Sequence, residues 1–274
     1  MIPAAFEYKR AGSVDEALSL LREYGDDAKV LAGGHSLLPL MKLRLATPSV
    51  LVDVGRIGEL SYISLDGNEV AIGAHSRHRD LQTSELLISW VPILAHVAGL
   101  IGDPQVRHRG TIGGSLSHGD PASDLPAVIL ALGGTLVVRS AARGERRIEA
   151  GNFWRGFLET ALEPDELLCE IRVPVSEGAF SFQKFNRRAQ DWAIVGVAAQ
   201  ANHSVAVSLV NMAATPVRAR AVEEALSQGA SPADAASLAA VDLDPPSDIN
   251  GSSEYRRHLA TVLVRRSLEE ILGG

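Results

Sequence analysis

The chain has 274 residues, which is enough for two folding units of ordinary size. Hydrophobic residues make up 46% and charged residues 22% of the sequence, so the composition is that of a globular protein and excludes a disordered or fibrous one. The net charge of -7 argues against a nucleic-acid surface, because Arg107, His108 and Arg109 form its one short basic cluster.

Cysteine usage and the first residues of the chain limit the cellular location and the metal chemistry. Cys169 is the only cysteine, so the chain can form no internal disulfide and cannot by itself ligate an iron–sulfur cluster or a cysteine-rich zinc site. The first residues show no charged stretch followed by an apolar one, and no uncharged run approaches the ~18 residues of a membrane-spanning helix. We therefore predict a cytoplasmic protein without a transmembrane segment.

The first part of the chain is predicted to alternate helix and strand. "SVDE", which starts at Ser13, has the spacing of a capping box, and an apolar stripe follows it, so a helix is expected there. Residues 29–32 predict a short buried strand that leads into a pair of glycines, and residues 50–54 predict another strand. The turn residues 66–68 lie between "YISL" and "VAIGA", which indicates two strands joined by a tight turn.

The remaining elements predict a second, different unit. "PVSEG", at residues 174–178, has the proline and glycine of a linker, and beyond it strands precede helices, which is typical of an α+β domain and not of a βαβ array. A helix is expected to start near Asp124, with a proline in its first turn. The other predicted helices cover residues 80–89, 92–100 and 255–272, and the predicted strands cover 136–139, 168–173, 180–185, 194–201 and 205–210.

Two stretches combine paired glycines with small hydroxyl residues. The first glycine segment is "LAGGHSLLP" (residues 31–39), and the second glycine segment is "TIGGS" (residues 111–115). Glycine has no Cβ, so main-chain N–H groups at such turns can approach an anion closely. We predict two turns of one kind that hold one phosphate or pyrophosphate from two sides. The expected donors lie at Gly33, Gly34, His35 and Ser36, and at Thr111, Gly113, Gly114 and Ser115.

The details of these segments narrow the ligand. Neither segment contains the lysine of a P-loop, and the sequence contains no G-x-G-x-x-G, so a nucleoside triphosphatase and a Rossmann dinucleotide site both lose their main support. An internal diphosphate held by neutral donors, as in FAD or a nucleotide sugar, fits better. The alternative is that both segments are ordinary tight turns.

Four blocks of sequence, in order, resemble one family. They are "AGGHSLLPLMKLRLATPSVLVDV" (32–54), "IGDPQVRHRGTIGGSLSHGDPASDLPA" (101–127), "ELLCEIRVP" (166–174) and "FSFQKFNRRAQDWAIV" (180–195). Together they resemble the FAD-carrying medium subunit of molybdenum hydroxylases, the group that contains carbon monoxide dehydrogenase and the flavin domain of xanthine dehydrogenase. The resemblance covers essentially the whole chain.

The resemblance implies both a fold and a cofactor site. The implied fold is α+β: a two-part PCMH-type FAD-binding domain at 1–175, with parts at about 1–56 and 57–175, and a smaller C-terminal flavoprotein domain at 176–274 with an antiparallel sheet and helices. The implied cofactor is noncovalent FAD. The residues expected to bind it in or beside the glycine segments are Ala32, Gly33, Gly34, His35, Ser36, Leu37, Ile101, Thr111, Gly113, Gly114, Ser115 and Ser117.

Four further residues are implied at the site, and three of them have an alternative role. Asp124 would bind the adenosine-side sugar or its surroundings, or else cap a helix. Leu168 would pack beside the flavin or adenine, or else belong to the core. Lys184 would lie near the isoalloxazine, where a cation stabilises reduced flavin, or else be solvated. Trp192 stands where related subunits often have tyrosine beside the flavin ring, so it can shield the ring but cannot supply a phenol. Ser115 stands where asparagine is common, so a shorter hydrogen-bonding group replaces the amide.

The resemblance also implies a function and partners. The chain would carry electrons from the iron–sulfur clusters of a small subunit to an external acceptor, while a large molybdopterin subunit oxidises the substrate, with the subunits assembled as a dimer of heterotrimers. No catalytic residue and no metal ligand is expected in this chain. The alternatives are a self-sufficient FAD-dependent oxidase or reductase, and an assembly protein that has lost the cofactor. The resemblance leaves open the substrate (carbon monoxide, an aldehyde, a purine or an N-heterocycle), the acceptor, and whether FAD stays bound without partners.

Three other features carry weaker expectations. His75 and His78 are three residues apart and could share a helix face, but no H-E-x-x-H motif supports a metal site. Cys169 lies in an apolar strand and is expected to be an inert core thiol. The basic cluster at residues 107–109 is expected to be a solvated loop or a subunit contact.

Overall fold

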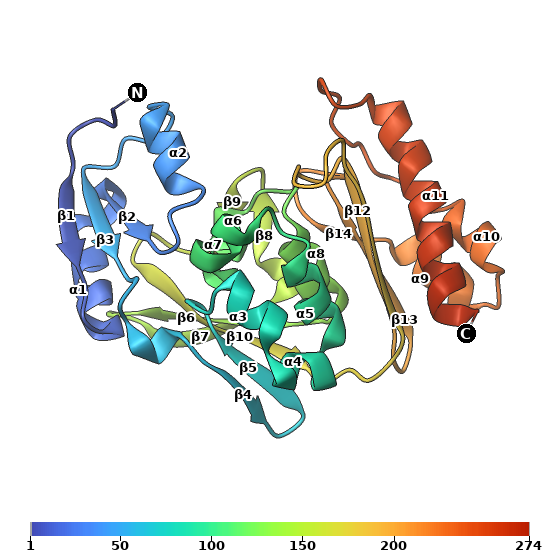
Figure 1. The fold of residues 1–274 in the computed structure, drawn as a ribbon, viewed down its shortest axis with the longest axis horizontal. Helices are drawn as coiled ribbons and strands as arrows, with labels where there is room; N and C mark the ends of the chain where they lie inside the picture. Colours follow the sequence, from blue (N-terminus) through green and yellow to red (C-terminus); the bar gives the residue numbers. More distant parts are fainter. Residues whose placement is uncertain (1, 274) are drawn as a thin grey trace.

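The computed structural model describes residues 2–273 and shows three units side by side (Figure 1). The N-terminal unit is a three-stranded sheet in the order β1-β3-β2, and both of its strand pairs are parallel. Parallel strands need crossover connections, and α1 and the first glycine segment lie in two of these connections. Its elements are β1 (Glu7–Arg10), α1 (Val14–Tyr24), η1 (Gly25–Asp27), β2 (Ala28–Leu31), α2 (Leu37–Lys42) and β3 (Val50–Asp53).

Helix α1 begins where the sequence predicted. The Ser13 side chain accepts a hydrogen bond of 3.1 Å from the Glu16 N–H. The Glu16 carboxylate accepts from the N–H of Gly12 at 2.7 Å, one residue before the donor of a standard capping box. Both bonds satisfy main-chain donors at the start of the helix.

The central unit is a five-stranded antiparallel sheet in the order β4-β5-β10-β6-β7, covered by helices. Its strands are β4 (Ile63–Asp66), β5 (Glu69–Gly73), β6 (Thr135–Ser140), β7 (Gly144–Glu149) and β10 (Glu166–Pro174), with a small hairpin of β8 (Trp154–Gly156) and β9 (Glu159–Thr160). Its helices are η2 (Gly58–Leu60), α3 (His78–Thr83), α4 (Glu85–Trp90), α5 (Pro92–Gly99), α6 (Pro104–Arg109), α7 (Ile112–His118), α8 (Asp124–Ala131) and η3 (Ala150–Asn152).

Strand β10 contributes to two hydrophobic cores. Its pairing with β6 is interrupted by a register shift between Leu168 and Glu170, so Cys169 is the extra residue of a β-bulge. The bulge changes the alternation of the strand: Leu168 and Ile171 belong to the central core, whereas Leu167 and Cys169 pack into the N-terminal core with α1 and β3. Burial raises the pKa of the Cys169 thiol to about 12, as expected for an inert core cysteine.

The C-terminal unit is a four-stranded antiparallel sheet between two layers of helices. In Figure 1 the sheet stands beside the central unit, with the last helices on its outer side. Its inner face contacts α5 and α8, and its outer face contacts α9 and α11. The elements are β11 (Phe180–Phe185), β12 (Val195–Ala201), β13 (Val205–Val210), β14 (Val217–Arg218), α9 (Arg220–Ser227), α10 (Pro232–Ala236) and α11 (Ser253–Leu272). This arrangement confirms the predicted α+β class and the C-terminal domain of antiparallel sheet and helices.

Two predicted elements differ from the observed ones. The helix expected at 80–89 is divided, because Ser84 has extended backbone angles and caps α4 by accepting from the Leu87 N–H at 3.3 Å. The cluster at residues 107–109 is not a loop but the last turn of α6. Helix α6 was not predicted. At its start Asp103 accepts from the Val106 N–H at 2.8 Å, and Pro104 takes the first helical position.

None of the helices in residues 2–273 combines the length and the apolar character needed to cross a membrane.

Candidate functional site

The first glycine segment connects β2 to α2 and lies against the residues that precede the second. A Cβ on Gly33 would stand 2.3 Å from the carbonyl oxygen of Arg109 and 2.9 Å from the Cα of Gly110. Gly34 has φ +78°, a left-handed angle that favours glycine. The two segments, which are separated by some eighty positions in the numbering, are therefore neighbours in space, as the sequence predicted.

The first glycine segment presents main-chain donors. Within residues 2–273, no main-chain hydrogen bond uses the N–H groups of Gly33, Gly34, His35 or Ser36. His35 is exposed, and Gly33, Gly34 and Ser36 are half-buried. Because buried or half-buried main-chain N–H groups normally have partners, this run of unpaired donors fits an anionic ligand.

The second glycine segment is built differently, so the prediction of two turns of one kind is wrong. Thr111 is the N-cap of α7, and its Oγ1 accepts from the Gly114 N–H at 3.1 Å. The Gly113 N–H donates to the Ala74 carbonyl at 2.8 Å, and the Ser115 N–H donates to the Thr111 carbonyl at 3.0 Å. The N–H groups of Gly113, Gly114 and Ser115 are thus engaged within the fold. The prediction failed because a Thr-x-x-Gly cap and a phosphate-binding turn have the same sequence pattern.

The two glycines of α7 serve different purposes. A Cβ on Gly113 would stand 2.6 Å from both Cβ and O of Ala74, so Gly113 allows α7 to lie against the end of β5. Gly114 is exposed, and a Cβ there would meet only the Thr111 Oγ1 at 2.8 Å. Gly114 therefore leaves this part of α7 open to a ligand.

Asp124 and Lys184 form an ion pair that joins two units of the structure. Lys184 Nζ, from β11, lies 2.7 Å from Asp124 Oδ2, at the start of α8, and the two side chains are 10% and 5% exposed. Burial raises the pKa of Asp124, although Lys184 opposes the shift. Asp124 is not the helix cap, because Ser123 occupies that position, and Lys184 is not solvated. Asp124 Oδ1 is buried and has no partner among the described residues, so it can accept one more hydrogen bond.

The other predicted residues lie in varied surroundings. Ser115 Oγ contacts Ser123 Oγ at 2.8 Å, which ties α7 to the residue before Asp124. Leu168 is 4% exposed and belongs to the central core, so its contact with a cofactor stays a prediction. Trp192 is 57% exposed on the loop between β11 and β12. The remaining half-buried residues of the predicted set are Ala32, Leu37, Ile101 and Ser117.

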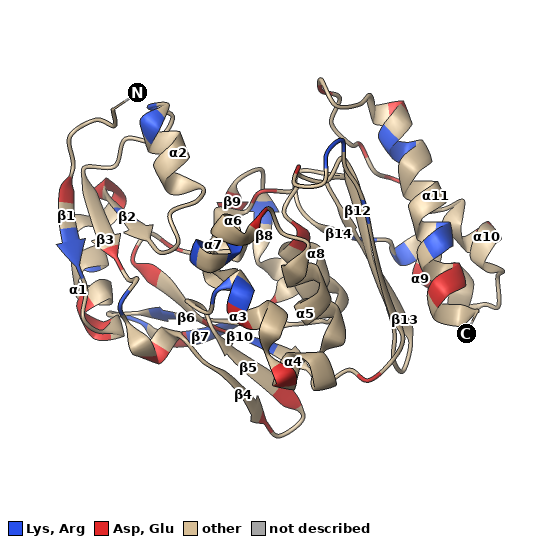
Figure 2. Ribbon diagram, in the orientation of Figure 1, with Lys and Arg blue, Asp and Glu red and all other residues tan. Residues whose placement is uncertain are grey.

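Positive charge gathers beside the first glycine segment in an otherwise acidic chain. Figure 2 shows basic residues on α3 and in the neighbouring region of α6 and α7. Arg107 donates to the Ile101 carbonyl at 3.0 Å, and Arg77 donates to the His108 carbonyl at 2.8 Å. The backbone of Arg109, at the end of α6, lies against Gly33, so this basic turn is next to the first glycine segment, and a nearby positive charge suits a diphosphate.

Histidines of the site are not arranged for a metal. Helix α3 begins at His78, so His75 does not share its face, contrary to the expectation. His78 is buried beside Gly110, and burial, with smaller effects of His35 and Arg107, lowers its pKa to about 4. Across residues 2–273 there is no grouping of three or more His, Cys, Asp or Glu residues that could hold a metal ion.

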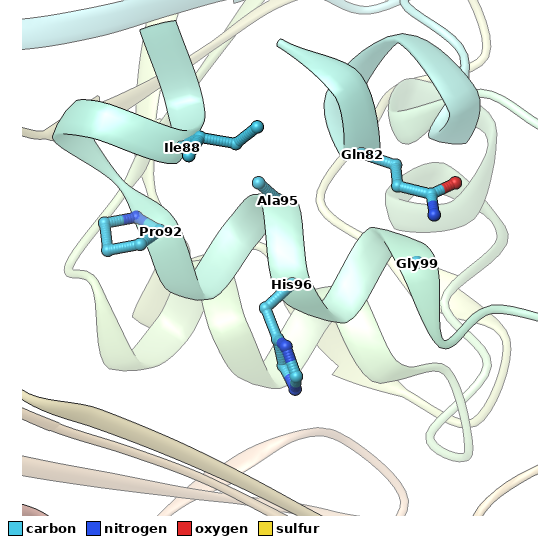
Figure 3. Close-up of a pocket in the computed structure, with 6 residues that line it drawn as sticks. All are labelled: Gln82, Ile88, Pro92, Ala95, His96 and Gly99. Carbon is cyan, nitrogen blue, oxygen red and sulfur yellow. The ribbon is translucent and has the colours of Figure 1, made fainter. Parts of the chain in front are cut away.

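Two cavities lie away from the glycine segments. A cavity of about 320 Å³ lies among α3, α4 and α5 (Figure 3). It is lined by Gln82, Ile88, Pro92, Ala95, His96 and Gly99. A smaller one, of about 150 Å³, lies between the N-terminal and central units and includes Glu59, Arg139 and Cys169 in its lining. Neither contains a residue of the predicted cofactor site.

The residues present fit a flavin dinucleotide. The unpaired N–H groups at Gly33 to Ser36 match a diphosphate, the buried Oδ1 of Asp124 matches a hydroxyl donor, and exposed Gly114 leaves room beside them. Residues 4–176 match the family described as the FAD binding domain in molybdopterin dehydrogenase, and residues 180–271 match the CO dehydrogenase flavoprotein C-terminal domain. Fold and site thus define an FAD-binding flavoprotein of α+β architecture.

Individual relatives agree with this class. The chain is similar to the carbon monoxide dehydrogenase medium chain of Hydrogenophaga pseudoflava, with 41% identity over 98% of this chain and 97% of the relative. It is similar to the glyceraldehyde dehydrogenase medium chain of Sulfolobus acidocaldarius, with 38% identity over 99% of this chain and 100% of the relative. The chain belongs to the family of FAD-binding medium subunits of molybdopterin dehydrogenases, which confirms the resemblance seen in the sequence.

Solved structures extend the agreement to three dimensions. A carbon monoxide dehydrogenase structure from Hydrogenophaga pseudoflava matches with a TM-score of 0.95 and 41% identity, covering 100% of this chain and 99% of that chain. Quinoline 2-oxidoreductase from Pseudomonas putida matches with a TM-score of 0.92 and 33% identity over the same shares of the two chains.

Proposed function

We propose that this chain is the FAD-carrying medium subunit of a molybdenum hydroxylase, and that it passes electrons from the iron–sulfur clusters of a partner subunit to an external acceptor. One observation carries the proposal: the chain is similar from end to end to medium chains of dehydrogenases whose names give different substrates, at 41% and 38% identity. What such chains share is the role of the medium subunit. The substrate is therefore chosen elsewhere in the complex, and a self-sufficient oxidase or reductase is not favoured.

The roles of the residues follow from their positions. The N–H groups of Gly33, Gly34, His35 and Ser36 bind the diphosphate, with Ala32 and Leu37 beside them. Exposed Gly114 and the Ser115 and Ser117 side chains of α7 line the opposite side. The cofactor, when bound, supplies the chemistry of accepting and releasing electrons. Thr111, Gly113, Ile101 and Leu168 support these groups from the central unit.

The ion pair at the domain contact has its own role. Asp124 Oδ1 accepts a hydrogen bond from a hydroxyl group of the cofactor, and Lys184 keeps the Asp124 carboxylate ionised for this purpose. Trp192 shields the ring system from water. The chain supplies no residue that acts on the organic substrate.

The assembly is proposed with the same logic. The chain works in the cytoplasm with a small iron–sulfur subunit and a large molybdopterin subunit, as a dimer of heterotrimers, and holds FAD noncovalently. The single cysteine supports clusters on another chain. We place the domain boundary between residues 175 and 176, with a division of the first domain near residue 56. The first family match ends at residue 176 and the second begins at residue 180, which supports a boundary in this region.

The native complex provides the test. Acid denaturation should release FAD into the supernatant at about one per medium chain, since the cofactor is proposed to be noncovalent. Removing FAD should abolish reduction of the natural acceptor, while substrate still bleaches the iron–sulfur absorbance. Release of FMN, flavin that stays on the polypeptide, or oxidation of an organic substrate by this chain alone would overturn the proposal.

A further inference from the structure

Arg256 is a fully buried arginine in an unfavourable place. Its side chain is 0% exposed, and it lies in the first turn of α11, where the helix dipole disfavours a positive charge. Its Nε has no partner among the described residues. Burying a charge and leaving one of its donors unpaired both cost stability, so the position needs an explanation other than packing.

The bonds of Arg256 suggest that explanation. Nη2 lies 2.8 Å from Asp248 Oδ2, and Nη1 donates to the carbonyl oxygen of Ile194. Asp248 is itself fixed, because its Oδ1 accepts from the N–H groups of Asn250 at 2.8 Å and Gly251 at 3.2 Å. Arg256 therefore connects a rigid turn before α11 to the end of the β11–β12 loop, which comprises residues 186–194.

Asn211 holds the neighbouring carbonyl of the loop. Its side-chain Nδ2 donates to the Ala193 carbonyl at 2.8 Å, and its main-chain N–H donates to the Pro121 carbonyl at 2.8 Å. Asn211 has φ +60°, a left-handed angle that is uncommon for residues other than glycine. Two successive carbonyls of the β11–β12 loop are thus held by side chains from two elements, and one of these residues also contacts the α7–α8 connection.

The other end of the loop is tied to the same region. Lys184, two residues before the loop, forms the buried pair with Asp124 at the start of α8. The Ile194 N–H donates to the Phe185 carbonyl at 2.8 Å, which closes the loop on itself. Between these anchors the loop leaves Trp192 exposed. One end of the loop is therefore fixed to α8 through Lys184, and the other end is fixed through Asn211 to the connection before α8. Such a loop can hold the Trp192 side chain in one position.

We infer that Arg256 and Asn211 are positioning residues, which hold the β11–β12 loop and its Trp192 as the wall that the C-terminal domain contributes to the FAD site. This inference rests on the proposed function. Neither residue touches the cofactor; each acts through the carbonyl that it holds, Ile194 for Arg256 and Ala193 for Asn211.

The test measures the FAD affinity of the assembled complex, by titrating FAD into the complex after its flavin has been removed. Arg256→Met removes both charged bonds at similar volume, and Asn211→Gly removes the amide while allowing the left-handed backbone. Each should weaken FAD binding about tenfold, the effect typical of losing a supporting contact. Arg256→Lys should recover part of the affinity. Arg257→Met, which removes a more exposed pair with Asp244, is the matched control and should bind like the parent.

A double-variant cycle separates positioning from general damage to the fold. In a Trp192→Ala background, Arg256→Met should weaken binding little further, because the side chain that it positions is already gone. Unchanged affinity in both Arg256→Met and Asn211→Gly, or fully additive effects with Trp192→Ala, would refute the inference. If Arg256→Met does not fold, the FAD affinity of Asn211→Gly, alone and combined with Trp192→Ala, tests the inference. A parent complex that binds no FAD would overturn the proposed function, and this inference with it.

Discussion

Lys184 Nζ contacts Asp124 Oδ2 at 2.7 Å and thereby joins the C-terminal sheet to the central unit through one buried ion pair. Lys184→Met should destabilise the protein by about 3 to 5 kcal/mol at pH 8, because the Asp124 carboxylate is left buried without its partner. The loss should be smaller at pH 5, since the pKa of Asp124 is already raised by burial and the carboxyl can then take up a proton.

Urea unfolding at the two pH values measures this difference. Arg265→Met, which removes the exposed pair with Glu269, is the control and should change the free energy of unfolding by less than about 1 kcal/mol. Equal losses for the two variants would mean that the Lys184 pair does not hold the units together.

Gly33 is predicted to be intolerant of any side chain. The Cβ of Gly33→Ala would stand 2.3 Å from the Arg109 carbonyl oxygen, so the two glycine segments must move apart. We expect a loss of about 1 to 3 kcal/mol in stability together with a fall in FAD content. Gly58→Ala is the control, because a Cβ on Gly58 meets no atom within 4 Å. If Gly33→Ala keeps the FAD content of the wild type, the contact between the two glycine segments does not form the cofactor site.

Gly114 should affect the ligand more than the fold. It lies in a helix without a positive φ, so a backbone penalty is not expected, and a Cβ would meet only the Thr111 Oγ1. Gly114→Val should therefore fold, with at most about 1 kcal/mol lost from the Thr111 cap, but lose FAD. Circular dichroism and FAD content measure the two effects. Gly151→Val, at a position with no atom within 4 Å of the added Cβ, should keep its FAD.

His78 should make stability depend on pH. Burial lowers its pKa from 6.5 to about 4, so the folded state keeps the ring neutral while the unfolded state takes up a proton. The associated stability is fully present above pH 6.5 and is lost as the pH falls toward 4, with a total of about 3 kcal/mol. His78→Gln should flatten this part of the profile, measured by urea unfolding from pH 7 to 4. His203→Gln, at an exposed position, should leave the wild-type slope unchanged.

The sequence predicted those features that depend on local signals. The strands at 180–185 and 205–210 match β11 and β13, because β-branched and aromatic residues with turns on either side leave little ambiguity. The start of α1 was marked by Ser13 and Glu16. The first glycine segment could also be placed, since its glycines follow directly on an apolar strand.

Other features could not be predicted because they depend on contacts distant in sequence. Nothing near Asp124 or Lys184 indicates that the two residues pair, since they lie on different units. The second glycine segment was misread because the Thr111 cap and the Ala74 contact of Gly113 appear only in the folded chain. Arg256 and Asn211 gave no signal, because a buried arginine and a left-handed asparagine look like surface residues in sequence.

The bulged strand β10 has a consequence for the order in which the protein can fold during synthesis. The N-terminal core is completed by Leu167 and Cys169, more than a hundred residues after β3. While the chain grows on the ribosome, part of the apolar surface of α1 and β3 therefore stays uncovered until β10 has been synthesised. The N-terminal core can therefore be completed only after residue 169 has emerged, and apolar surface that stays uncovered until then is of the kind that chaperones bind.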